Sequence, residues 1–215
     1  MNLAVKSGAM LARSAARGYR VVSYDELRTK ATVVARSLLE RYRGQSKHIV
    51  IAPILMGGGL PARLILDALA PFGIVGAVVP CQLQRYLGVA RAGQAHILTP
   101  LPRRRIAGEI VVGVDDLVDG GETLRAFCAH ATAQGAGRVD TAVLYAKPHS
   151  NLAPGHCAEK GVTQWLVLPG EEHDFMQHLA SKDEAVRALP ADETRAYFEE
   201  LGMGGHIVSE WLALQ

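Results

Sequence analysis

One segment near the middle of the chain constrains the fold more than any other. Val111–Leu124 reads VVGVDDLVDGGETL, and the apolar, β-branched run Ile110–Val114 predicts a buried strand. Two carboxylates stand where this strand is expected to end, and a glycine-rich turn follows. Leu124–Gln134 then predicts a helix that is closed by Gly135. Similar strands and helices alternate along the rest of the chain, which predicts an α/β protein with a parallel sheet.

The same segment has the chemistry of a phosphate and sugar site. The backbone N–H groups of the turn Asp119–Thr123, together with the N-terminus of the next helix, suit a phosphate. The carboxylates of Asp115 and Asp116 suit ribose hydroxyls and Mg²⁺, which prefers oxygen ligands. Adjacent carboxylates repel each other, so we expect a cation or hydroxyl groups to compensate them. The alternative is an ordinary strand–turn–helix connection with acidic capping residues.

VVGVDDLVDGGETL resembles the 5-phosphoribosyl-1-pyrophosphate (PRPP) signature of type I phosphoribosyltransferases. The resemblance implies that Asp115 and Asp116 hold the ribose hydroxyls and Mg²⁺, and that Asp119 is the general base or a hydrogen-bond acceptor at the purine imidazole. It also implies that a turn wraps the 5′-phosphate, formed by Asp119, Gly120, Gly121, Glu122 and Thr123. Gly120 departs from the family pattern because it stands where Thr is usual, so one hydroxyl donor is lost while Thr123 remains.

A glycine triad follows the expected strand His48–Leu55 and precedes an expected helix, Leu60–Leu69. Three glycines let the backbone donate N–H groups to an anion without obstruction. In the family, the matching loop holds pyrophosphate, which implies that Met56, Gly57 and Gly58 bind PRPP. The residue before the glycines is usually basic, so with Met56 the pyrophosphate charge must be offset by Mg²⁺ or by another chain. A tight helix entry is the alternative.

Two further segments resemble the xanthine-guanine phosphoribosyltransferases. Lys147 lies in an Ala-Lys-Pro sequence, which implies that it contacts the exocyclic oxygen of a 6-oxopurine. Trp165 begins a Trp-x-x-x-Pro sequence, which implies that the indole stacks on the base while backbone groups near Leu166 read its edge. A solvated lysine and a core tryptophan are the alternatives.

The resemblance covers roughly residues 19–171 and implies the type I phosphoribosyltransferase fold. This fold has a parallel sheet with helices on both faces, a small hood, and a mobile lid. The polar stretch Gln82–Arg105 is the expected lid, closing over PRPP and excluding water. We divide the chain into an N-terminal arm (1–18), the phosphoribosyltransferase domain with its hood (19–170) and a C-terminal helical extension (171–215). Further expected elements are a helix from Ser23 to Tyr42, strands Gly76–Cys81, Val139–Tyr145 and Trp165–Leu168, and helices Glu171–Leu189 and Asp192–Leu201.

Composition narrows the remaining function classes. The chain has 215 residues and a formal net charge of +2, which gives no case for nucleic acid or a membrane surface as partner. Its three cysteines have no metal-binding spacing, and no apolar run approaches a membrane span. We therefore expect a cytoplasmic protein. The first twenty residues have four basic residues and no acid, so a mitochondrial transit peptide stays open as the alternative to an N-terminal arm.

The function implied by the resemblance is purine salvage. A purine nitrogen attacks PRPP in the presence of Mg²⁺, pyrophosphate leaves, and a nucleoside monophosphate forms. The family is commonly dimeric or tetrameric, which implies a homodimer or homotetramer. One alternative is a PRPP-binding regulator with little catalysis, favoured by the departures at Met56 and Gly120. The other is a phosphoribosyltransferase for another base.

Overall fold

The computed structural model describes residues 18–87 and 90–215 of the chain. Two compact units divide them: Leu27–Thr163, and a smaller unit in which residues 18–26 join Gln164–Gln215. The expected N-terminal arm and its transit-peptide alternative fall almost entirely on residues 1–17, outside the described part. Within the described residues, no helix combines the length and apolar character that crossing a bilayer requires.

The larger unit is built on a mainly parallel sheet with strand order β5-β4-β2-β6-β7-β8, and β3 pairs with β2. Only the β4–β5 pair is antiparallel among the described strand pairs of this unit. The strand bounds are β2 Ile49–Leu55, β3 Val75–Val78, β4 Cys81–Leu87, β5 Ala90–Thr99, β6 Ile110–Val118, β7 Arg138–Ala146 and β8 His156–Lys160. The predicted α/β class with a parallel sheet is confirmed.

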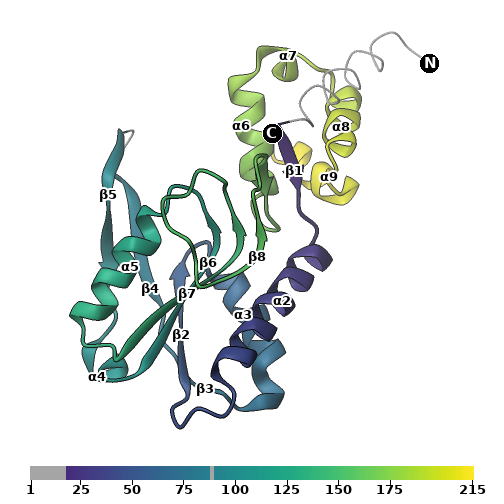
Figure 1. The fold of residues 1–215 in the computed structure, drawn as a ribbon. Helices are drawn as coiled ribbons and strands as arrows, with labels where there is room; N and C mark the ends of the chain where they lie inside the picture. Colours follow the sequence, from purple (N-terminus) through teal and green to yellow (C-terminus); the bar gives the residue numbers. More distant parts are fainter. Residues whose placement is uncertain (1–17, 88–89) are drawn as a thin grey trace. The chain divides into compact units, whose positions relative to one another are not determined.

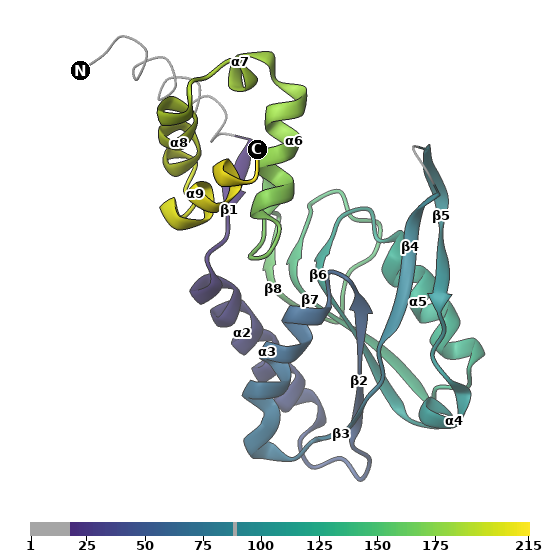
Figure 2. The same cartoon turned by 180° about the vertical axis from the view of Figure 1, so that it is seen from behind.

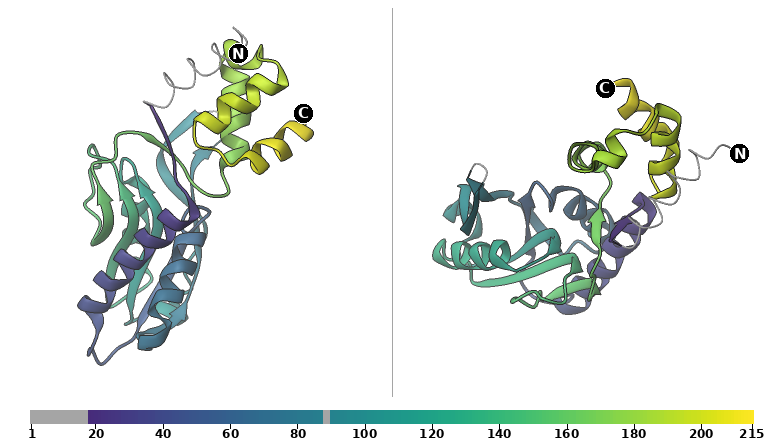
Figure 3. Two further views of the ribbon diagram at one scale, coloured as in Figure 1. Left: turned by 90° about the vertical axis from the view of Figure 1, so that its right-hand side faces the viewer. Right: turned by 90° about the horizontal axis from the view of Figure 1, so that it is seen from above.

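Helices cover both faces of this sheet, as expected (Figures 1 and 3). α5 packs on one face, where Phe127 lies so close to β6 that a Cβ on Gly113 would be 2.3 Å from its ring. α2 and α3 lie on the other face, joined by an Arg28–Asp67 ion pair of 2.9 Å. The helix bounds are α2 Tyr24–Tyr42, α3 Gly59–Leu69, η1 Ala70–Phe72 (a 3₁₀ helix), α4 Arg103–Ile106 and α5 Glu122–Ala133.

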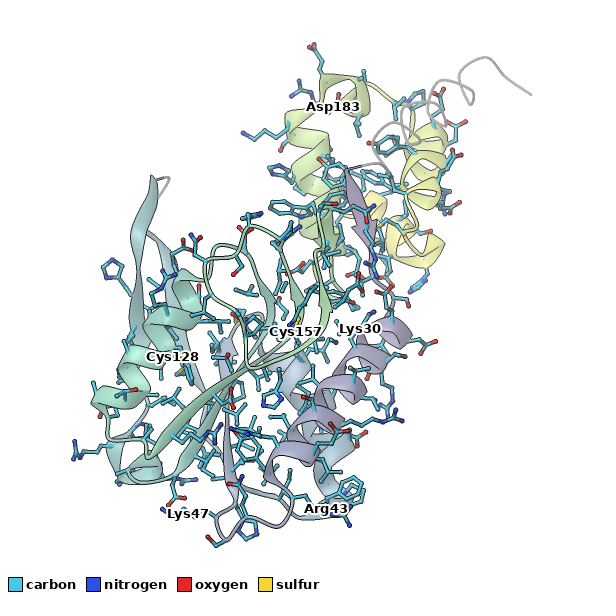
Figure 4. The ribbon with its side chains drawn as sticks, viewed as in Figure 1. Lys30, Arg43, Lys47, Cys128, Cys157 and Asp183 are labelled. Atoms are coloured by element: carbon cyan, nitrogen blue, oxygen red, sulfur yellow. The ribbon has the colours of Figure 1, made fainter. Side chains whose placement is uncertain are left out.

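Side chains fasten α2 to the start of β7 and to β8 (Figure 4, where Lys30 on α2 is labelled). Lys30 pairs with Glu159 at 2.7 Å, and the Tyr42 hydroxyl donates to Asp140 at 2.7 Å. Burial, followed by this hydrogen bond, raises the pKa of Tyr42 to about 12. Burial alone would raise the pKa of Asp140, but hydrogen bonds from His156 and Tyr42 outweigh it and lower that pKa.

Two predictions for the sheet are wrong. The expected strand Gly76–Cys81 is divided between β3 and β4, because Pro80 has no N–H to donate and the pairing moves along β2. The stretch Gln82–Arg105 is mostly not a loop: β4 and β5 form an antiparallel ribbon at the edge of the sheet (Figure 2). The closure of this ribbon over PRPP stays a prediction. β8 was missed in the sequence because it is short and half polar.

The smaller unit holds the hood. β1 (Tyr19–Val21) pairs in parallel with β9 (Trp165–Val167), and Tyr19 lies beside Trp165. Four helices follow, with bounds α6 Glu172–Lys182, α7 Glu184–Arg187, α8 Ala191–Glu200 and α9 Gly205–Ala213. Their core includes Val167 of β9, with partly buried residues of β1 packed against it. The C-terminal helices and the hood strands therefore share one core, whereas the expected boundary between residues 170 and 171 stays a prediction.

The C-terminal helices differ in detail from those expected. Residues 171–189 form two helices because Asp183 is extended, with φ −106° and ψ 109°, and its side chain accepts a 2.9 Å hydrogen bond from Ala185 N. This is the geometry of an N-cap, which ends one helix and begins the next. α9 was not expected.

Candidate active site

The acidic pair lies inside a strand and not beyond its end. β6 continues to Val118 because Leu117 and Val118 still pair with Tyr145 and Ala146 of β7. The turn then bends sharply at Gly121, which has φ 94°, and α5 begins at Glu122. A small cavity of about 60 Å³ is lined by Asp115, Leu117, Val118, Asp119, Gly120, Gly121, Glu122, Thr123 and Leu124. The structure thus brings Asp115 and every turn residue expected to bind phosphate around one cavity.

Burial and the closeness of the two carboxylates both disfavour their charged forms. Asp115 is only 9% exposed, and burial, followed by repulsion from Asp116, raises its pKa well above the usual value. Burial also raises the pKa of Asp116. The backbone N–H of Asp116 donates to Asp115 Oδ1 at 3.1 Å, and that of Leu117 donates to Asp116 Oδ1. Bound hydroxyls or a cation would relieve this cost.

The glycine triad packs directly against the strand that bears the acidic pair. A Cβ on Gly57 would lie 2.6 Å from Asp116 Oδ2, and a Cβ on Gly58 would lie 2.0 Å from the Val114 carbonyl. The peptide bond between Leu55 and Met56 is cis. A side chain at Gly57 or Gly58 would therefore collide with Asp116 or with the backbone of β6, so glycine is required at both positions for this close packing.

Fewer backbone N–H groups of the glycine triad can donate to an anion than the sequence predicts. The N–H of Gly58 donates to the Ile54 carbonyl at 2.8 Å, and that of Gly59 donates to the Met56 carbonyl at 3.1 Å. Gly57 is therefore the glycine of the triad with an N–H left for a ligand. Met56 is 84% exposed and brings no charge.

We expect Gly58→Ala to destabilise the protein by about 1–3 kcal/mol, because the added methyl group meets backbone that cannot move freely. The Tm, measured by calorimetry, should fall by roughly 2–10 °C. Gly59→Ala is the matched control: its Cβ would meet Leu55 Cδ2 at an ordinary 3.7 Å, so its Tm should stay the same or rise slightly. Equal melting temperatures for the two variants would contradict this packing.

A second loop packs against the turn Asp119–Thr123. Beyond the end of β7, Lys147 N donates to the Val118 carbonyl at 2.9 Å, and Asn151 N donates to the Gly120 carbonyl at 3.1 Å. Burial lowers the pKa of Lys147, although nearby Asp119 acts to raise it. Lys147 and Asp119 are thereby held at the same carboxyl end of the sheet, as expected for a ligand site in a parallel sheet.

Sequence reasoning missed one residue of this loop. His149 Nε2 lies 2.7 Å from Asp119 Oδ1, with side chains that are 64% and 44% exposed. His149 directly follows the Lys-Pro sequence. Its position just after the end of a strand is the feature of the sequence that could have identified it as a site residue. Its partner, 30 residues earlier in the chain, becomes visible only when the two loops meet.

In the smaller unit, Trp165 is 65% exposed, so it is not a core residue, whereas Trp211 is the buried tryptophan at 5%. Leu166 is buried. A cavity of about 570 Å³ is lined by Tyr19, Trp165, Val167, Glu171, Asp174, Phe175 and His178. An exposed indole beside such a cavity is available to stack on a planar ring.

Within the described residues, no cluster of three or more His, Cys, Asp or Glu side chains can hold a metal ion. Mg²⁺ commonly binds one or two carboxylates and completes its coordination with water and substrate phosphates. The buried, mutually repelling pair Asp115 and Asp116 fits that kind of site.

The comparisons with known proteins agree with this geometry. A family model described as "Phosphoribosyl transferase domain" matches residues 23–169. The fold is similar to a purine phosphoribosyltransferase from Pyrococcus horikoshii, with 21% identity, a TM-score of 0.58, and coverage of 71% of this chain and 94% of that one. It is also similar to hypoxanthine phosphoribosyltransferase from Trypanosoma cruzi, with 22% identity, a TM-score of 0.55, and coverage of 63% and 73%.

A third similar structure is a hypoxanthine-guanine phosphoribosyltransferase from Bacillus anthracis, with 19% identity, a TM-score of 0.54, and coverage of 65% of this chain and 79% of that one. A search of the curated proteins finds no match. At these identities the solved structures show the shared fold.

Proposed function

Because the chain belongs to the phosphoribosyltransferase family of glycosyltransferase-type enzymes, we propose that it transfers phosphoribosyl from PRPP to a 6-oxopurine. Pyrophosphate is released and a nucleoside monophosphate forms. The observation that carries this proposal is the single cavity that joins Asp115 to the turn Asp119–Thr123, beside the glycine loop.

Each part of PRPP has a proposed partner. The 5′-phosphate binds in the turn at the N-terminus of α5, where backbone N–H groups suit a phosphate and Thr123, which lines the cavity, offers a hydroxyl. The ribose hydroxyls lie against Asp115 and Asp116. Pyrophosphate lies against Met56, Gly57 and Gly58, where the absence of side chains lets it approach the backbone.

Asp115 and Asp116 would also hold Mg²⁺, whose contribution is to neutralise charge on the leaving pyrophosphate. The protein's own part is to align the reactants and to keep its donors fixed before the reaction begins. Burial of the two carboxylates fits this role, since it fixes their positions and makes any ligand that compensates their charge bind more favourably.

The proposed partners of the base are Lys147 and Trp165. The Lys147 ammonium would contact the 6-oxygen and favour the purine tautomer that is alkylated. The exposed indole of Trp165 would stack on the ring, with backbone groups near Leu166 at its edge. Asp119 would accept the proton from the purine imidazole ring as the new N–C1′ bond forms.

The test is a panel of free bases, incubated with PRPP and Mg²⁺ and read by pyrophosphate release. Guanine, hypoxanthine or xanthine should give turnover, while adenine, orotate and uracil should not. Turnover with orotate or uracil alone would place the chain with phosphoribosyltransferases for another base. Binding of PRPP by calorimetry without turnover on any base would favour a PRPP-binding regulator.

The regulator is the second candidate because one observation favours it: Met56 is exposed and uncharged where the family usually has a basic residue before the glycines. An exposed methionine contributes nothing to the neutralisation of pyrophosphate. Two observations favour catalysis. The turn residues Asp119–Thr123 all line one cavity, and Asp119 is held by a hydrogen bond with His149.

We expect Lys147→Ala to lower kcat/KM for hypoxanthine and guanine by roughly 10–100-fold, the cost of losing one charged hydrogen bond. Any residual activity with adenine should change much less, because adenine has no 6-oxygen. Steady-state kinetics with each base checks this expectation. Lys160→Ala, which removes an exposed lysine at the end of β8, is the control. Equal losses on all bases would remove Lys147 from base selection.

We also propose that the protein assembles as a homodimer or homotetramer in the cytoplasm. Among the described strands, β3 pairs only with β2, and apolar side chains of Phe72 and Val78 are exposed next to it. An open strand edge with exposed apolar residues favours association. Sedimentation velocity across a range of concentrations would test it, and a monomer at every concentration would contradict it.

A further inference from the structure

The structure gives the proposed base, Asp119, a partner that the sequence did not reveal. His149 Nε2 and Asp119 Oδ1 are 2.7 Å apart. A carboxylate accepts hydrogen bonds, so the imidazole must carry its proton on Nε2 in this contact. Asp119 Oδ2 has no hydrogen-bond partner among the described residues and stays available to a substrate.

The contact is held by backbone on both sides. Asn151 N donates to the Gly120 carbonyl at 3.1 Å, and Ser150 N donates to the Lys147 carbonyl at 3.3 Å. On the turn, a Cβ on Gly121 would lie 2.8 Å from Leu152 Cβ, so the turn and the loop are in close contact. The loop therefore places the imidazole against the carboxylate without depending on the histidine alone.

We propose that His149 is a positioning residue for proton transfer in the transferase reaction, an inference that rests on the proposed function. Its Nε2–H fixes one oxygen of Asp119 and leaves the other directed to the base.

The reaction balances with Asp119 as the proton acceptor. A purine ring nitrogen forms its bond to C1′ with the electron pair that it holds, and its N–H proton passes to Asp119 Oδ2. The bond from C1′ to the pyrophosphate oxygen breaks, and pyrophosphate leaves with that electron pair. Asp119 then loses the proton to water when the nucleotide departs. His149 keeps its Nε2 proton throughout and neither gains nor loses an atom.

Two substitutions at His149 separate positioning from a merely structural role. Gln places a neutral N–H close to the position of Nε2, so His149→Gln should keep kcat within about 3-fold of the wild-type value at pH 8. His149→Ala removes the donor and should lower kcat about 10-fold at pH 8, with the Kd for PRPP unchanged by calorimetry. His48→Ala, an exposed histidine at the amino end of β2, is the control and should behave like the wild type.

The proposal is overturned if both His149 variants match the wild type, or if both are equally impaired. An NMR experiment tests the contact without any turnover. The imidazole signal that disappears in His149→Gln should change its chemical shift in Asp119→Asn, and an unchanged signal would also overturn the proposal. If no base on the panel reacts while this signal does shift, the proposed function fails and the contact stands.

Discussion

Replacing Asp119 by Asn is expected to lower kcat with the preferred purine by roughly 10²–10⁴-fold, the usual contribution of a general base. The amide keeps the size of the side chain and its hydrogen bond to His149 through an oxygen, but it does not accept the purine proton. PRPP binding should be nearly unchanged, because the phosphate turn and the acidic pair remain in place. Rapid-quench kinetics and calorimetry measure the two effects separately.

Asp192→Asn is the control, since Asp192 is an exposed acid in the first turn of α8. It should leave both kcat and the Kd for PRPP at their wild-type values. A purine assay in which Asp119→Asn turns over at the wild-type rate would exclude Asp119 as the base.

Asp115→Asn is expected to weaken PRPP binding while raising stability. Loss of a charged hydrogen-bond acceptor at the ribose costs about 1.5–3 kcal/mol, which increases the Kd for PRPP roughly 10–100-fold. The folded protein, however, no longer carries a buried negative charge next to Asp116. Its Tm in the absence of ligand, measured by calorimetry at pH 7.5, should therefore rise by several degrees.

The pH dependence of this gain has a defined sign. Burial and Asp116 raise the pKa of Asp115 in the folded state above its value of about 3.9 in the unfolded chain. The folded wild type therefore binds the proton more tightly, and the resulting stability is lost as the pH rises above about 4. Asn is neutral at every pH, so its advantage over the wild type should be absent near pH 3.5 and grow toward neutral pH. A gain that is the same at both pH values would contradict the electrostatic explanation.

The sequence predicted the parts of this protein that depend on local chemistry. Apolar β-branched runs located most of the parallel strands, and Ser23 with Glu26 located the start of α2, where Glu26 N donates to Ser23 Oγ at 3.1 Å. The turn between β6 and α5 was also predicted, because its acidic residues and glycines are neighbours in the sequence, and these residues line one cavity. Phosphate binding at this turn stays a prediction.

What the sequence did not predict depends on partners far away in the chain. β6 extends through the acidic pair because β7 continues beside it, and the polar stretch after Cys81 becomes strand because β4 and β5 pair with each other. The His149–Asp119 contact has the same origin. Pairing across the chain outweighed local composition in each case.

The pairing of β1 with β9 has a consequence for how the protein is made. During translation, Tyr19–Val21 leaves the ribosome long before Trp165–Val167 is synthesised, so the first strand has to wait for its neighbour. The larger unit can already fold in that interval, because β8, the last strand of its sheet in the sequence, ends at Lys160. A chain that stalls after Lys160 would thus contain every residue that lines the cavity of Asp115 and the turn Asp119–Thr123, while β1 would still lack β9.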